Sequence, residues 1–189
     1  QILIRIHLND QQNDSTVINV AGRQRMLSQK LTKEVVSLST EDNTATKIIL
    51  KDKIKNTLAL WQLSHLSLKM GNDTLGLPGN NSAIITNMFS EINPSFNKIN
   101  DASKIIISKI ENDPSIGIES FINNINAVKK NESSFLLMMD KIVNQYDSEA
   151  NEKVSWLRKL ELLLMTLTLL ILLGELIFIF WPTAKTVKN

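Results

Sequence analysis

The chain has 189 residues, is 43% hydrophobic and carries a formal net charge of +2 at pH 7. Because this charge is small and the basic residues are scattered among acidic ones, the composition argues against a nucleic-acid partner. The chain contains no cysteine. This excludes disulfides, thiolate metal sites and cysteine nucleophiles, and it fits a periplasmic domain.

The first residues, QILIRIHLN, are apolar but too few to cross a membrane. They carry neither the charged leader nor the small-residue cleavage site of a complete signal peptide. We interpret residues 1–8 as the outer end of a truncated first transmembrane helix. The alternative is a frayed helix start.

The following residues show helical periodicity and no convincing strand alternation. Clusters of Gly, Pro, Asn, Asp and Ser interrupt this periodicity at residues 39–46, 71–82 and 111–117. Four long segments lie between the breaks, at residues 8–38, 45–70, 83–110 and 132–160. Long segments of near-equal length with short breaks predict an all-α fold, an antiparallel up-down four-helix bundle. In this arrangement the loop at residues 71–82 lies at the end of the bundle near the bilayer.

Two features modify this simple bundle. Residues 118–128 predict a short amphipathic helix that caps the far end of the bundle with Phe121, Ile125 and Val128. Pro94 should kink or split the third helix, because it removes one backbone hydrogen bond and clashes with the preceding turn.

The fourth segment leads into a long apolar run. One stripe of the segment consists of Phe135, Met139, Ile142, Tyr146, Ala150, Val154 and Leu157. No breaker separates it from LLLMTLTLLILLGELIFIFW, residues 162–181, which only Glu175 interrupts. At about 1.5 Å per residue this run covers about 30 Å, one hydrocarbon core. The bundle is therefore expected to be continuous with a transmembrane helix at residues 161–182.

Charges next to the apolar run indicate its orientation. Lys185 and Lys188 follow it, and the positive-inside rule then places the C-terminus in the cytoplasm. The expected organisation is a four-helix-bundle domain outside the cytoplasm at residues 9–160, and the start of a cytoplasmic linker at residues 183–189.

The stretch INVAGRQRMLSQKL, residues 18–31, predicts a first helix with two faces that can each pack against another helix. At about 100° per residue, one apolar stripe faces the bundle core: Val20, Leu27, Leu31, Val35 and Leu38. A second, heptad-like stripe contains Ile18, Ala21, Arg25, Ser28, Thr32 and Val36. Since a second stripe needs a second partner, we predict that it is the interface of a C2 homodimer.

Arg25 is the one cation at the centre of this second stripe. Two such side chains facing each other across a dimer axis repel in a partly dry seam unless something neutralises them. A small anion on the axis would gain charge-assisted hydrogen bonds from both guanidinium groups. The alternative is that Arg25 pairs with an acidic residue or reaches water and binds no ligand.

At these residues the chain resembles a known family. INVAGRQRMLSQKL is similar to the signature of PilJ-type sensor domains, the N-terminal domain of type IV pili methyl-accepting chemotaxis transducers, and to the P-box of NarX-type nitrate/nitrite sensor kinases. The resemblance continues through LPGNNS, FSEINPSF and FLLMMDKIVNQYDSEANEKVSWLRKLE. It implies a protein of the bacterial inner membrane whose periplasmic four-helix bundle lies between two membrane spans and feeds a histidine kinase, diguanylate cyclase or chemoreceptor output.

The resemblance also implies a ligand site. In NarX-type sensors the first arginine of the P-box binds nitrate across the dimer axis, and Arg25 matches that position. Asn19, Ala21, Gly22, Met26 and Ser28 match the box as well. Arg23 and Gln24 replace the small and apolar residues of nitrate sensors, and the residues after Met26 differ too, so the ligand's identity does not carry over. The expected ligand-binding residues are Arg25, Ala21, Gly22 and Ser28.

The other polar residues indicate neither a metal site nor a catalytic site. His65 lies one turn from Trp61 with no second ligand at metal spacing, so a buried or capping histidine is the better interpretation. A solvated face explains Asp140, Asp147, Glu149 and Glu152. With no phosphate loop, nucleophile elbow or zinc motif, we expect neither an enzyme, a metal nor a cofactor.

The sequence therefore predicts the extracytoplasmic sensor region of a bacterial transmembrane signalling receptor. It would bind a small anion such as nitrate or nitrite at the dimer interface and transmit a helix shift through the membrane. The alternative is a ligand-free dimerisation or protein-docking module that senses a pilus or envelope component.

Overall fold

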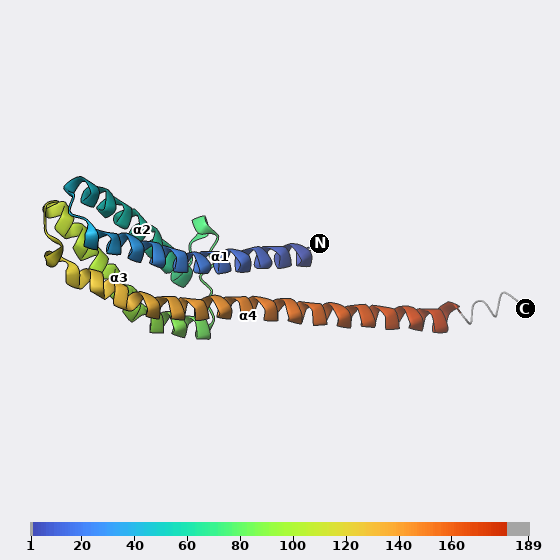
Figure 1. Ribbon diagram of the computed structural model, residues 1–189. Helices are drawn as coiled ribbons and strands as arrows, with labels where there is room; N and C mark the ends of the chain where they lie inside the picture. The colour runs from blue at the N-terminus through green and yellow to red at the C-terminus, as the bar shows by residue number, and fades with distance from the viewer. Residues whose placement is uncertain (1, 181–189) are drawn as a thin grey trace, which may run out of the picture. The chain divides into compact units, whose positions relative to one another are not determined.

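The computed structural model describes residues 2–180 of the chain and the side chains of residues 11–178. The fold is all-α, and in the described part the only β pairing is an isolated bridge between Asn72 and Leu77. The helices are α1 (Ile2–Ser37), η1 (Leu38–Thr40), α2 (Thr44–Met70), η2 (Asp73–Leu75), α3 (Ala83–Asn112), η3 (Ile118–Ser120), α4 (Ile122–Glu175) and the π-helix η4 (Leu176–Phe180) (Figure 1). This confirms the helical bundle expected from the sequence.

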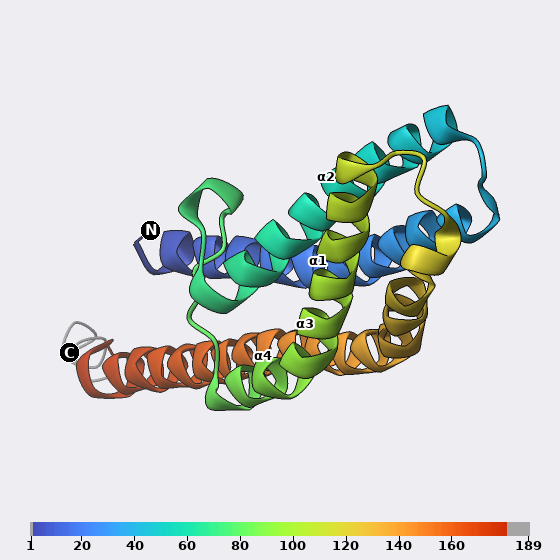
Figure 2. The ribbon, with the colours of Figure 1, turned by 90° about the vertical axis from the view of Figure 1, so that its left-hand side faces the viewer.

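The chain divides into two compact units, Gln1–Asp147 and Ser148–Asn189, and α4 contributes residues to both. The first unit holds α1, α2, α3 and the first part of α4, which form the bundle (Figure 2). The domain boundaries expected after residues 8, 160 and 182 stay predictions.

The fourth helix begins earlier than its predicted start at residue 132. A separate capping helix at residues 118–128 is wrong: a single turn, η3, is followed directly by α4 at Ile122. The residues from Ile122 to Glu132 contain no Gly or Pro, so nothing stops the helix between them. The apolar pattern was nevertheless correct, because Phe121, Ile125 and Val128 are buried.

Pro94 lies inside α3, which continues on both sides of it as one helix. The split that the sequence allowed is therefore wrong. Figures 1 and 2 show that α3 bends in its N-terminal half. A bend is the usual response of a helix to a proline ring that clashes with the preceding turn and removes one backbone donor.

Side-chain caps and glycines set the ends of the helices. Asn43 Oδ1 accepts a hydrogen bond from the Thr46 N–H at 3.1 Å, and Ser82 Oγ accepts one from the Ile85 N–H at 3.2 Å. These caps satisfy backbone donors that an α-helix leaves free at its start. Between α2 and α3, Gly79 has φ of 70° and a Cβ there would lie 2.5 Å from the Gly71 nitrogen, so only glycine fits.

The loop at residues 71–82 is tied to two other elements of the bundle. Asn81 Nδ2 donates to the Leu68 carbonyl at 2.8 Å, and Tyr146 Oη of α4 donates to Asn81 Oδ1 at 2.7 Å. Gly76 lies beside Thr16 of α1. The loop thus joins the N-terminal half of α1 and the middle of α4 at one end of the bundle, as the up-down topology requires.

An aromatic cluster occupies the centre of the bundle. The Trp61 ring lies 4.4 Å from the Phe96 ring and 4.9 Å from the Phe135 ring, measured between centroids. His65 stacks on Phe96 at 3.9 Å and meets Phe89 edge-on at 5.4 Å. These rings come from α2, α3 and α4, so burial of large apolar surfaces holds the three helices together.

In the second unit, large apolar side chains are exposed throughout residues 162–173 and 176–178. Taken together, α4 and the start of η4 form one continuous helical stretch, Ile122–Phe178. Its most apolar 18 residues have a mean hydropathy of 2.2, and none of them is buried. By length and composition it can cross a membrane. Trp181, Lys185 and Lys188, on which the orientation and the linker at residues 183–189 depend, lie outside the described residues.

Candidate functional site

Arg25 lies in the C-terminal half of α1 and faces α4. Its Nε is 2.5 Å from Oδ1 of Asp140, and the two side chains are 46% and 44% exposed. Since both groups still contact water, this ion pair contributes little to stability, about 0–1 kcal/mol. The contact is made by Nε, so the terminal amino groups of the guanidinium can still donate to an anion.

The residues of the second stripe of α1 differ in burial within the single chain. Ala21 and Ser28 are fully buried, and they lie beside the core residues Leu27, Leu31 and Val35 on one wide face. The remaining members differ, because Ile18, Thr32 and Val36 are half-buried and Arg25 is exposed. The surface open to another molecule is therefore narrower than the sequence indicated, and Arg25 remains at its centre.

Two polar side chains fix the backbone of α1 around Arg25. Gln24 is buried and its Nε2 donates to the Trp61 carbonyl of α2 at 3.1 Å. The Ser28 hydroxyl donates to the Arg25 carbonyl at 2.9 Å. Ser28 thus acts within its own helix, while Gln24 attaches α1 to α2 and so holds the Arg25 side chain on a rigid element.

Gly22 precedes Arg25 by three residues and is half-buried. A Cβ built at this position meets no heavy atom within 4 Å. Packing inside one chain therefore does not require a glycine at this position. A glycine inside a helix also lowers the stability of the fold by about 0.5–1 kcal/mol relative to alanine. The glycine keeps the backbone accessible beside Arg25, where a partner helix or a ligand can approach closely.

Gly22→Ala is therefore expected to stabilise the isolated chain by about 0.5–1 kcal/mol. The measurement is urea unfolding in detergent at a protein concentration where the chain is monomeric. Gly79→Ala is the matched control and should destabilise the chain, because its Cβ overlaps the backbone of Gly71 and Met70. A loss of stability in Gly22→Ala would contradict the open space beside this glycine.

The sequence pattern does not reveal two polar residues of this site, the ion-pair partner of Arg25 and the side chain that ties α1 to α2. It favours a solvated face for Asp140, yet Asp140 forms the ion pair with Arg25. Its position directly after Met139 of the α4 core stripe was the available signal, since that places it at the edge of the buried face. Gln24 stands out in the sequence only as a departure from the nitrate-sensor pattern, although it lies at the centre of the buried face of α1.

His65 is the buried histidine that the sequence favoured, with 1% of its surface exposed. Neither ring nitrogen has a hydrogen-bond partner among the described side chains. Burial, followed by the nearby charge of Lys69, lowers the pKa of His65 from 6.5 to about 4. Within the described residues no three His, Asp or Glu side chains form a group that could hold a metal ion.

The described residues thus combine a helical bundle, with Arg25 exposed on its first helix, and one helix apolar enough to cross a membrane. A sequence model of the PilJ family, described as "Type IV pili methyl-accepting chemotaxis transducer N-term", matches residues 6–114. The match covers more than half of the chain, and the chain belongs to this family. Comparison with curated proteins gives no match.

Among solved structures, the chain is similar to the ligand binding domain of the P. aeruginosa nitrate receptor McpN. The TM-score is 0.50 at 20% sequence identity, and the match covers 71% of this chain and 96% of that chain. At this identity the likeness shows a shared fold. The family and the fold together confirm the PilJ-type sensor domain that the motifs predicted.

Proposed function

We propose that the chain is the extracytoplasmic sensor region of a bacterial transmembrane receptor that binds a small anion, such as nitrate or nitrite, at a homodimer interface. The family match supports a chemotaxis receptor, and the name of the McpN domain supports nitrate as the first anion to test. The observation that carries the proposal is the placement of Arg25, which is half-exposed on α1 and beside the open backbone of Gly22.

Among the described side chains Arg25 has one weak anionic partner, and an external anion can replace it. The Asp140 carboxylate is half-exposed, so water already competes for its contact with Arg25. In a dimer, one anion on the axis would accept charge-assisted hydrogen bonds from two guanidinium groups, whereas each Asp140 reaches only its own arginine. We therefore expect the bound anion to displace Asp140 from Arg25 in both chains.

This exchange supplies a mechanism for signalling. Arg25 is on α1 and Asp140 is on α4, so the anion removes one link between these helices and adds one between the two copies of α1. A ligand that binds one arrangement more tightly shifts the population toward it. The proposed shift between α1 and α4 would then pass through residues 161–182 to a cytoplasmic output.

The test is the binding of nitrate and nitrite to the full chain in detergent, measured by calorimetry and thermal unfolding. At about 100 times its dissociation constant, the anion should stabilise the fold by about 2.7 kcal/mol. This shift should be absent in Arg25→Ala and unchanged in Arg23→Ala, which removes an exposed arginine from the same helix. Asp140→Asn should bind the anion more tightly than the wild type, because it removes the competing carboxylate.

The dimer interface is tested by crosslinking. The chain has no cysteine, so single Ile18→Cys or Thr32→Cys variants place one thiol on the half-buried part of the second stripe. Symmetric disulfide dimers in membranes are the expected result. If neither variant crosslinks, or if Arg25→Ala keeps the full nitrate shift, the anion site at a dimer seam is wrong.

A second candidate function is docking of an envelope or pilus protein without a small ligand. The surface of α2 favours it, because Leu60, Leu63, Leu66 and Met70 are 45%, 49%, 49% and 78% exposed. Exposed apolar side chains gathered on one helix are typical of protein interaction sites. Two results together would favour docking over anion binding: no anion stabilises the chain, and Leu63→Glu rather than Arg25→Ala abolishes the signalling response.

A further inference from the structure

A small pocket lies between α2 and α3, on helices other than those that carry Arg25 and Asp140. Its volume is about 250 Å³. The two helices contribute side chains at the same spacing: Lys55, Leu58, Ala59 and Gln62 from α2, and Lys104, Ile107, Ser108 and Glu111 from α3. Residues spaced three, four and seven apart lie on one face of a helix, so each helix presents a continuous strip to the pocket.

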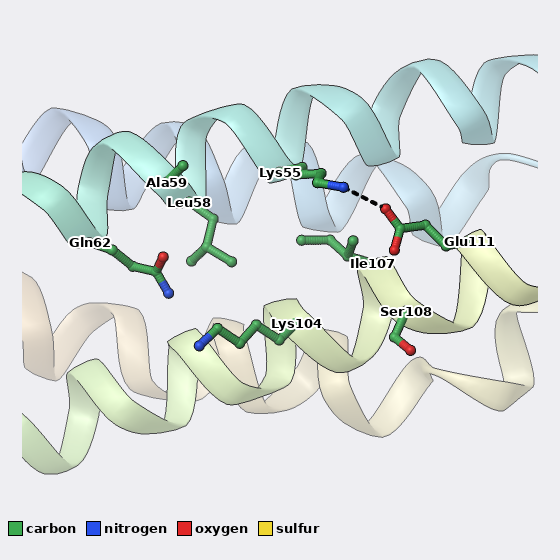
Figure 3. Close-up of a pocket in the computed structure, with 8 residues that line it drawn as sticks. All are labelled: Lys55, Leu58, Ala59, Gln62, Lys104, Ile107, Ser108 and Glu111. Carbon is green, nitrogen blue, oxygen red and sulfur yellow. Dashed lines mark hydrogen bonds and ion pairs between the residues drawn. The ribbon is translucent and has the colours of Figure 1, made fainter.

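The floor of the pocket is apolar. Leu58 is 4% exposed and Ile107 is 7% exposed, and Figure 3 shows both between the charged ends of the pocket. Ala59 is exposed and also lines the pocket. Such a floor favours an aliphatic group over a strongly hydrated ion.

The charges at the two ends of the pocket differ. At one end Lys55 Nζ lies 2.8 Å from Glu111 Oε1, and this hydrogen bond raises the pKa of Lys55 and lowers the pKa of Glu111. The pair is therefore ionised at neutral pH and contributes no net charge. At the other end Figure 3 shows the Lys104 ammonium near the Gln62 amide, whose Nε2 donates to Asn100 Oδ1. Lys104 has no ion pair with a described side chain, so the pocket has one uncompensated positive charge.

We propose that this pocket binds a small aliphatic monocarboxylate, with its carboxylate on Lys104 and its apolar tail on Leu58, Ala59 and Ile107. One uncompensated ammonium group matches one carboxylate. A second carboxylate on the ligand would approach Glu111 and be repelled. The volume is below the roughly 300–1,000 Å³ of pockets for drug-sized ligands, which restricts the occupant to a small molecule.

The site is independent of the proposed anion site. It uses α2 and α3, whereas the proposed anion site uses Arg25 of α1 in contact with α4. A receptor with both sites would respond to an inorganic anion and to an organic acid through different helices. The following experiment therefore includes a variant at each site.

The probe is isovalerate, a branched aliphatic monocarboxylate, added to the full chain in detergent with methyl-labelled isoleucines. Titration should shift the Ile107 methyl resonance in a saturable manner. Lys104→Met should weaken binding about tenfold or more, since it removes a charge-assisted hydrogen bond. Lys104→Arg should retain binding, and Ala59→Met should block it by filling the pocket.

Two control variants and a neutral ligand show whether binding depends on the charge of Lys104 in this pocket. Lys98→Met removes an exposed lysine from the same helix and should leave the affinity unchanged, as should Arg25→Ala. Isovaleramide, the neutral analogue, should bind at least about tenfold more weakly. The proposal is overturned if isovalerate leaves Ile107 unshifted, if the amide binds equally well, if Lys98→Met matches Lys104→Met, or if Arg25→Ala abolishes the shift.

Discussion

Phe135→Ala is expected to destabilise the bundle by about 3–5 kcal/mol, the usual cost of truncating a buried aromatic side chain. Phe135 is fully buried, and its ring is the contribution of α4 to the aromatic cluster. It contacts the Trp61 ring at 4.9 Å and lies 6.3 Å from the His65 ring, again between centroids. Removing it opens a cavity between α4 and α2, so the loss includes both the transfer of the ring to water and the missing contacts.

The chain contains its own reporter for this measurement. It has three tryptophans, and Trp61 is the one in the bundle unit. With Trp156→Phe and Trp181→Phe as background, Trp61 fluorescence follows urea unfolding of the bundle in detergent. Leu137→Ala is the matched control, because Leu137 is on the same helix, is 63% exposed and should change stability by less than about 0.5 kcal/mol. Equal effects of the two variants would contradict the packing of α4 on the aromatic cluster.

Acidification from pH 7 to pH 4 is expected to remove about 3 kcal/mol of stability through His65 alone. Burial against Phe96 and Phe89 lowers the pKa of His65 to about 4 in the folded state, from 6.5 in the unfolded chain. Between these two values the unfolded chain binds a proton that the native state does not. Stability due to this group is therefore complete above pH 6.5 and falls as the pH decreases toward 4.

His65→Phe isolates this contribution from that of the carboxylates. Glu111 and Asp113 also have lowered pKa values, caused by hydrogen bonds to Lys55 and Ser115, so some acid dependence remains in every variant. The difference in unfolding free energy between wild type and His65→Phe should change by about 3 kcal/mol from pH 7 to pH 4. Parallel pH profiles for the two proteins would show that His65 takes up a proton as readily folded as unfolded.

Local patterns in the chain were sufficient to predict most of the secondary structure. The breaks at residues 39–46 and 71–82 lie where the caps Asn43 and Ser82 start α2 and α3. Turn residues and caps act over a few positions, so their effect is readable without knowing the neighbours. The start of α4 was predicted ten residues too late, although residues 122–132 contain no Gly or Pro that would stop a helix.

The candidate site was predictable only in part. The sequence singled out Arg25 by its position in a stripe, but the burial of Ala21 and Ser28 depends on how much of α1 the neighbouring helices cover. A helical wheel gives the angle of each residue and not the width of the face that neighbours cover. The partner Asp140 is far away along the chain, so only the packing of α4 beside α1 could reveal it.

The sequence by itself determined the helices, their core stripes, the apolar run and the family, because periodicity, breakers and motifs are local properties of a chain. The tertiary structure decided which polar groups meet. It paired Arg25 with Asp140, removed His65 from water and formed the pocket of Lys104 between α2 and α3. These outcomes depend on the height and rotation at which helices distant in the chain pack together, and ridge-and-groove contacts between side chains set that arrangement.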